Sequence, residues 1–107
     1  MIGNCFTRAL NKLFAGKYVY RCRMSKKEFG DLKRKYDGDK TVNVIFNRYI
    51  GNLWEVVLYR DEKDEYGDED LKLYKIAEYN GDRCIFRFCQ EFKDIIKLDE
   101  KFVIEKL

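Results

Sequence analysis

Hydrophobic and polar residues alternate with a period of two along three stretches of the chain, and this spacing predicts β-strands. Residues 17–24 predict a single strand. Residues 41–60 predict two strands joined by a tight turn at Gly51-Asn52. Residues 71–90 predict a second hairpin, because the Asn-Gly pair at positions 80–81 is the strongest short hairpin signal in the chain. Since hairpins dominate, the sheet should be largely antiparallel.

Two other stretches have the spacing of apolar residues that is typical of an amphipathic helix. Residues 5–15 carry their large apolar side chains on one face and are followed by Gly16, which favours termination of a helix. Residues 26–36 follow a capping box, in which Ser25 and Glu28 can each satisfy a free amide of the first turn.

The order of these segments predicts an α+β fold in one domain spanning residues 1–107. The tail is expected to add a short helical turn at 92–98 and a final strand at 101–106. The predicted order is then α-β-α-ββ-ββ-β, with two N-terminal helices packed on a mostly antiparallel sheet of five to six strands. A chain of 107 residues can bury one core and is too short for two.

The first predicted hairpin is apolar on both faces. With a two-residue turn, paired positions sum to 103, which places Tyr49 opposite Trp54 and Arg48 opposite Glu55. One face then carries a set of large apolar side chains, namely Ile45, Tyr49, Trp54, Val56 and Leu58. Because the predicted helices cover only one face of the sheet, this aromatic face is covered by another segment, buried in a homodimer, or free to bind a partner.

The second hairpin should pair positions that sum to 161, which places Glu78 opposite Arg83 and Tyr74 opposite Arg87. Ahead of it, residues 61–70 contain seven acidic residues in ten. A strand rarely holds that density of charge, so this segment is predicted to be an exposed loop. It lacks the ligand spacing of an EF-hand, so no calcium site is expected.

The net charge of +3 conceals an asymmetry between the two halves of the chain. Residues 1–50 contribute +8 and residues 51–107 contribute −5. Such a distribution steers charged partners and sets their orientation. It supports one alternative function, a nucleic-acid-binding module that uses the basic segment 21–35. The cations of that segment are Arg21, Arg23, Lys26, Lys27, Lys33, Arg34 and Lys35.

Catalytic and metal-binding chemistry finds little support in the sequence. The chain has no histidine, and its only serine is better explained as a helix cap. The four cysteines lack the close pairs of a zinc site, so we expect free thiols, no metal and no cofactor. A histidine-independent ribonuclease that uses Arg, Lys, Tyr and Glu is a second alternative, based only on analogy in size and class with small bacterial toxins that cleave messenger RNA.

The favoured prediction is a small non-enzymatic binding protein that inhibits or redirects a host protein, such as a nucleic-acid-handling or defence enzyme. The absence of proline and the abundance of Lys, Asn, Ile and Tyr are typical of an AT-rich genome, so a phage or mobile-element origin is expected. No secretory signal is seen, so we expect a cytoplasmic protein, in the host cytoplasm if viral, with no membrane association. The predicted protein-interaction residues are Tyr49, Trp54, Asp64, Glu65, Asp68, Glu69 and Asp70.

Overall fold

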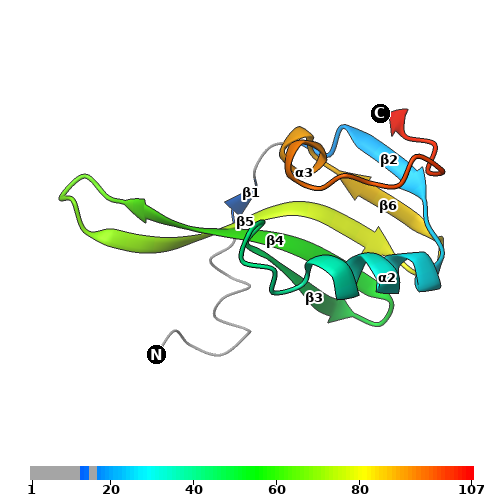
Figure 1. The fold of residues 1–107 in the computed structure, drawn as a ribbon, viewed down its shortest axis with the longest axis horizontal. Coiled ribbons are helices and arrows are strands. Elements are labelled where there is room, and N and C mark those ends of the chain that lie inside the picture. The colour runs from blue at the N-terminus through cyan, green and yellow to red at the C-terminus, as the bar shows by residue number, and fades with distance from the viewer. Residues whose placement is uncertain (1–12, 15–16) are drawn as a thin grey trace.

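A computed structural model describes residues 13–14 and 17–107, and Figure 1 shows one curved sheet with two helices beside it. In chain order the elements are β1 (Leu13–Phe14), β2 (Tyr20–Arg23), α2 (Lys26–Tyr36), β3 (Val44–Ile50), β4 (Leu53–Lys63), β5 (Glu69–Asn80), β6 (Ile85–Phe88), α3 (Gln90–Ile95) and β7 (Glu105–Lys106).

The sheet has the strand order β3-β4-β5-β6-β2-β7, with every pair along this path antiparallel. Strand β1 pairs in parallel with β5 at Leu13 and Tyr74. The predicted α+β class and mostly antiparallel sheet are therefore confirmed.

The predicted helix order is wrong in part. Residues Leu13–Phe14 form a strand, whereas a helix was predicted over 5–15; the rest of that segment lies outside the described residues. The second described helix, α3, lies between β6 and β7. It confirms the helical turn predicted at 92–98 with slightly earlier bounds, and the final strand is shorter than the predicted 101–106.

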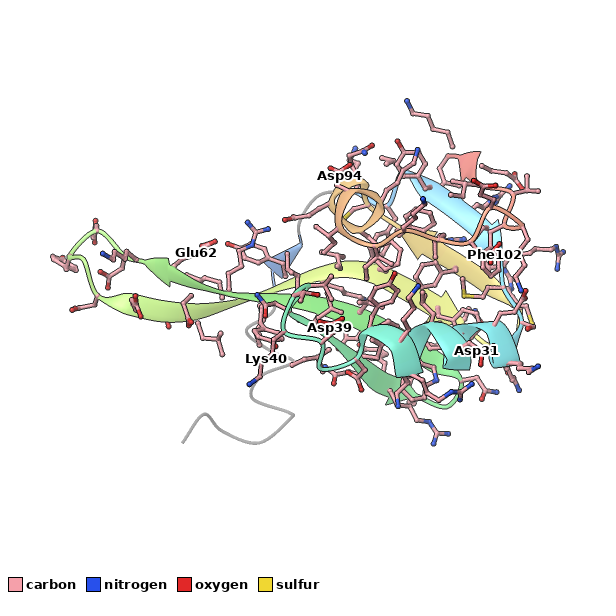
Figure 2. All side chains as sticks on the ribbon, viewed as in Figure 1. Asp31, Asp39, Lys40, Glu62, Asp94 and Phe102 are labelled. Atoms are coloured by element: carbon pink, nitrogen blue, oxygen red, sulfur yellow. The ribbon has the colours of Figure 1, made fainter. Side chains whose placement is uncertain are left out.

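Both described helices contribute to a single hydrophobic core on one face of the sheet. From α2, the ring of Phe29 stacks on that of Tyr79 with a centroid distance of 4.2 Å. From α3, the ring of Phe92 lies 5.1 Å from Phe86 and 5.0 Å from Phe88. Figure 2 shows side chains filling the space between the helices and the sheet. Aromatic rings thus form the centre of the fold.

The predicted capping box at the start of α2 is confirmed. The backbone amide of Glu28 donates to Ser25 Oγ at 3.1 Å, and the backbone amide of Ser25 donates to Glu28 Oε1 at 2.8 Å. This second bond, together with Lys101, holds the pKa of the Glu28 carboxyl below its usual value. The cap fixes where α2 begins and therefore which of its residues faces the sheet.

The first hairpin has the predicted turn but a different register. Ile50 pairs with Leu53, as expected, but a bulge at Tyr49 shifts the pairing, so Arg48 lies opposite Trp54. The predicted pairs of Tyr49 with Trp54 and of Arg48 with Glu55 are wrong. One inserted residue exchanges the two faces of a strand. The even-numbered residues of β4 therefore face α2.

This exchange answers the question about the aromatic face. Trp54 joins the core cluster, and its ring lies 5.8 Å from that of Phe29. Val56 and Val57, on opposite faces of β4, are 0% and 1% exposed. Both faces are therefore covered at the centre of β4. Of the two aromatic residues on the predicted face, Tyr49 is exposed, at 63%, and Trp54 is not.

The second hairpin is also shifted from its predicted register. Asn80 pairs with Ile85 and Glu78 pairs with Arg87, around a four-residue loop at 81–84. The Asn80 side chain accepts hydrogen bonds from the amides of residues 82 and 83, and the amide of Gly81 donates to the Asn52 carbonyl at 2.8 Å. Because Gly81 makes this contact with the other turn, it does not form the tight two-residue turn that Asn-Gly predicts.

Candidate functional site

A long hairpin formed by β4 and β5 extends beyond the rest of the sheet (Figure 1). Strands continue to Lys63 and resume at Glu69, so the prediction of a loop over 61–70 is wrong at both ends. Among the described strands, β4 beyond Tyr59 and β5 before Leu73 pair only with each other. Four residues per strand give a projection of about 13 Å. We call residues 60–72 the acidic arm, since they contain seven carboxylates and three cations.

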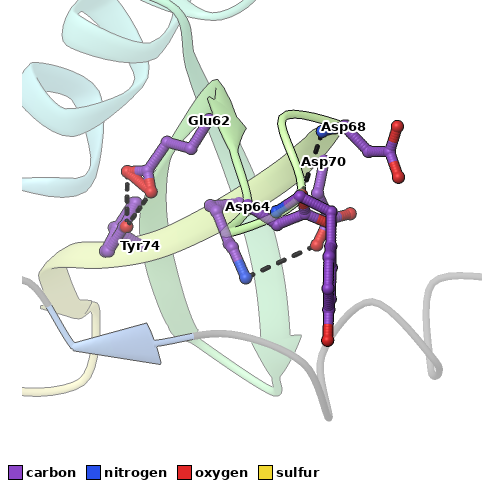
Figure 3. A network of polar contacts seen from close by, with 7 residues as sticks. Glu62, Asp64, Asp68, Asp70 and Tyr74 are labelled. Atoms are coloured by element: carbon purple, nitrogen blue, oxygen red, sulfur yellow. Dashed lines mark hydrogen bonds and ion pairs between the residues drawn. The ribbon is translucent and has the colours of Figure 1, made fainter.

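The tip of the acidic arm is ordered by Asp64. Its Oδ1 accepts hydrogen bonds from the amides of Tyr66 and Asp68, both at 2.9 Å, and its own amide donates to the Asp68 carbonyl at 2.8 Å (Figure 3). Gly67 has a φ of +84°, which glycine adopts without strain. As a result, the Tyr66 side chain is 81% exposed at the tip.

The stem of the acidic arm is fixed to the body by polar contacts. Tyr74 Oη donates to the Glu62 carboxylate at 2.6 and 2.8 Å, and this bond raises the pKa of the Tyr74 hydroxyl. The Arg60 guanidinium lies 5.1 Å from the centre of the Tyr74 ring and forms an ion pair with Glu91 of α3. Within the arm, Lys72 Nζ lies 3.4 Å from the Asp70 carboxylate (Figure 3). The contacts of Glu62 with Tyr74 and of Arg60 with Glu91 join the arm to the body.

The structure divides the predicted protein-interaction residues into two groups. The five carboxylates, Asp64, Glu65, Asp68, Glu69 and Asp70, all lie in the acidic arm and are exposed. Tyr49 and Trp54 lie near the other end of β4, beside the turn at 51–52. Trp54 is half-buried beneath α2, whereas the Tyr49 ring has Lys75 Nζ 5.6 Å from its centre. The structure therefore brings the five carboxylates together and places the two aromatic residues apart from them.

The predicted basic segment is also divided, because its two ends lie on different faces. In β2 the core side chain is Cys22, so Arg21 and Arg23 point away from the helices. The remaining cations, Lys26, Lys27, Lys33, Arg34 and Lys35, belong to α2. Arg34 pairs with Asp31 of the same helix, and Lys35 lies 5.2 Å from the centre of the Tyr36 ring. The cations of segment 21–35 are thus shared between the outer face of β2 and the helix α2.

A shallow apolar depression of about 200 Å³ lies between α2 and the two turns at 51–52 and 81–84. Lys26 and Lys33 flank it, and Lys33 Nζ lies 5.5 Å from the centre of the Trp54 ring. Its floor includes Phe29 and Tyr79, which belong to the core. The depression is thus a gap at the edge of the core beside Gly30.

A group of arginines that the sequence did not predict lies on the face opposite the helices. Arg83 and Arg87 come from the second hairpin and line a depression together with Arg21. The predicted register placed Arg87 opposite Tyr74, and so hid this grouping. One signal was present in the sequence: Arg87 stands between Phe86 and Phe88, as an outward residue on a buried strand would.

The cysteines that the structure describes are wholly or partly buried. Cys22 and Cys89 are buried, Cys84 is half-buried, and all three are free thiols. Burial raises the pKa of the Cys22 thiol to about 11, with a smaller contribution from Glu28. Within residues 17–107, no three Cys, Asp or Glu side chains gather closely enough to hold a metal ion.

Comparison of the chain with known protein families, proteins and structures gives no guide to its function. No protein-family model, curated protein or solved structure matches the chain. In the described part of the chain, neither helix has the length and apolar character needed to cross a membrane.

Proposed function

We propose that this is a non-enzymatic binding protein whose acidic arm occupies a basic surface on another protein. The observation that carries the proposal is the arm itself, an ordered hairpin that extends from the body and holds seven carboxylates. A basic protein surface that normally binds nucleic acid is the partner with the matching charge.

The shape of the acidic arm suits insertion into a groove. A hairpin of two paired strands is narrow, and the backbone groups that face inward are paired between its two strands. The contacts of Asp64, Glu62 and Tyr74 order it before binding, so less conformational entropy is lost on association. A charged loop without such contacts would lose more conformational entropy on binding than this ordered arm does.

Tyr66 gives the arm a hydrophobic anchor among its charges. It is 81% exposed at the tip, and tyrosine is enriched at the energetic centres of interfaces. Carboxylates around it would guide the approach to a basic partner, and the ring would then be buried on contact. The aromatic face predicted from the sequence is not needed for this role.

The proposal is tested by capture from a nuclease-treated lysate on the immobilised protein. The test variant is Glu65→Gln, Asp68→Asn, Glu69→Gln, which removes three charges and keeps the Asp64 turn. The matched control is Asp94→Asn, Asp99→Asn, Glu100→Gln, which removes three exposed charges from the body. A dominant basic protein should bind the wild type and the control, be released by heparin, and fail to bind the arm variant.

Two results would contradict the proposal. One is capture that the arm variant and the control affect equally, which would indicate a general charge effect. The other is the absence of any captured protein with both wild type and control. Tyr66→Ala should weaken binding without changing its salt dependence, because it removes an apolar contact only.

A further inference from the structure

A second depression, of about 360 Å³, lies on the face of the sheet opposite the helices. Its lining residues come from β2, β5, β6 and the loop at 81–84, and they are Arg21, Glu78, Asn80, Arg83, Ile85 and Arg87. Three of these six are arginines, and this site lies apart from the acidic arm.

Strand pairing places two of the arginines directly against each other. Arg21 of β2 is the cross-strand partner of Arg87 of β6, and both point to the same face. Like charges at directly opposed positions of an antiparallel pair destabilise the sheet. A bound anion between them would relieve that repulsion.

Two carboxylates beside the arginines, one across the strand pair and one along the chain, have other polar partners. Glu78, the cross-strand partner of Arg87, lies 3.5 Å from Lys75 Nζ. Asp82 accepts a hydrogen bond of 2.6 Å from the Asn52 side chain. Within the described residues, only Arg21 of the three arginines has an ion pair, with Glu105 at 3.3 Å.

We infer that this depression binds a phosphate group. Arginine presents a planar fork of donors that matches phosphate geometry, and several arginines around one concavity can surround the oxygens. The phosphate could belong to a small molecule, such as pyrophosphate or a nucleotide, or to the backbone of a nucleic acid. In both cases Arg83 and Arg87, which form no ion pair among the described residues, supply the charge, and Arg21 completes the site.

Two probes distinguish the sources in low-salt buffer that is free of phosphate and sulfate. Pyrophosphate binding is measured by calorimetry, and binding of a labelled single-stranded RNA oligonucleotide by fluorescence anisotropy over a salt series. Binding of pyrophosphate indicates a small-molecule site, whereas salt-dependent binding of RNA alone indicates a backbone site. The double variant Arg83→Gln, Arg87→Gln should lower the affinity for whichever probe binds by about tenfold or more.

The matched control is Lys27→Gln, Lys35→Gln, which removes the same charge from the exposed side of α2. It should leave binding nearly unchanged. Equal weakening by both variants, or no binding of either probe to the wild type, would overturn the inference. So would a change in oligomeric state in the arginine variant, since that would indicate that the site binds the acidic arm of a second copy.

Thermal stability supplies an independent readout. Without ligand, Arg87→Gln should change the melting temperature little, because it removes both the repulsion of Arg21 and the attraction of Glu78. Added pyrophosphate should raise the melting temperature of the wild type more than that of the variant. A wild type that pyrophosphate stabilises no more than Arg87→Gln would refute the role of the Arg21–Arg87 pair.

Discussion

Phe29 is the residue whose truncation should weaken the fold most directly. Its ring, 4% exposed, stacks on Tyr79 at 4.2 Å and contacts the rings of Phe46, Trp54 and Phe86 at 5.6–5.9 Å. Phe29 is the only fully buried residue of α2, and the partly buried Leu32 and Tyr36 pack beside it. The Phe29→Ala substitution therefore removes the contacts of the helix with four aromatic partners at once.

The size of the effect follows from burial and ring contacts. Truncation of a buried phenylalanine to alanine costs about 3–5 kcal/mol, a large share of the about 5–15 kcal/mol that stabilise a small domain. The conservative change Phe29→Leu keeps an apolar side chain but loses the stack on Tyr79, and should cost about 1–2 kcal/mol.

The assay is urea unfolding followed by tryptophan fluorescence and far-UV circular dichroism. Trp54 is the only tryptophan and lies 5.8 Å from Phe29, so its emission reports on the docking of α2. With a slope of about 1.5 kcal/mol/M, Phe29→Ala should lower the midpoint by about 2–3 M.

A loss below about 1 kcal/mol for Phe29→Ala would refute this account of the core, since exposed substitutions rarely exceed about 0.5 kcal/mol. Lys27→Ala, on the exposed side of the same helix, is the control and should stay within that limit. If the two variants were equally destabilised, the effect would belong to the helix and not to the ring contacts.

Four further predictions concern the turns, α2, the buried thiol and the arm. Gly81→Ala should cost about 1–2 kcal/mol in the same urea assay, because its Cβ would lie 3.1 Å from Asn52. Gly30→Ala should stabilise by about 0.5–1 kcal/mol, since its Cβ meets only ordinary contacts in a helix; a loss would show that the α2 packing is tighter than described. Burial raises the pKa of Cys22 to about 11, so its contribution to stability is complete at neutral pH and is lost as pH rises from about 9 through 11. Cys22→Val should flatten that decline, measured as midpoint against pH. Asp64→Ala should speed amide exchange at the arm tip without moving the global midpoint.

Features that depend on residues a few positions apart were predictable from the sequence. The capping box of Ser25 and Glu28, the alternation in β2 and the turn at Gly51-Asn52 are all of this kind. Each is decided by the chemistry of neighbouring side chains and backbone groups, so a short window contains the information.

The wrong predictions arise where a strand or a turn contains more residues than the local pattern indicates. The bulge at Tyr49 exchanged the faces of β4 and moved Trp54 into the core. The contact between Gly81 and Asn52 replaced a tight turn by a longer loop. The residue pattern within each hairpin does not predict the bulge or the contact between the two turns.

The acidic arm and the arginine depression were hidden for different reasons. A strand with a buried face excludes many carboxylates, but beyond Tyr59 the hairpin has no core to cover, so both of its faces can hold charge. The arginine depression depends on the pairing of β2 with β6, whose members lie far apart in the chain. Its residues could be named from the sequence, but their proximity could not.

The position of β2 in the sheet also determines when folding can be completed. Strands β3 to β6 form a meander of successive antiparallel neighbours, so they can pair soon after each is synthesised. β2 comes earlier in the chain, yet it lies between β6 and β7, and its Arg21 meets Glu105 across 84 residues. Pairing β2 with β6 closes a longer span than any hairpin in this sheet, and it must wait until β6 has left the ribosome. Until β2 has paired with it, β6 is an open edge of the meander, and we expect the nascent chain to be most prone to aggregation at that stage.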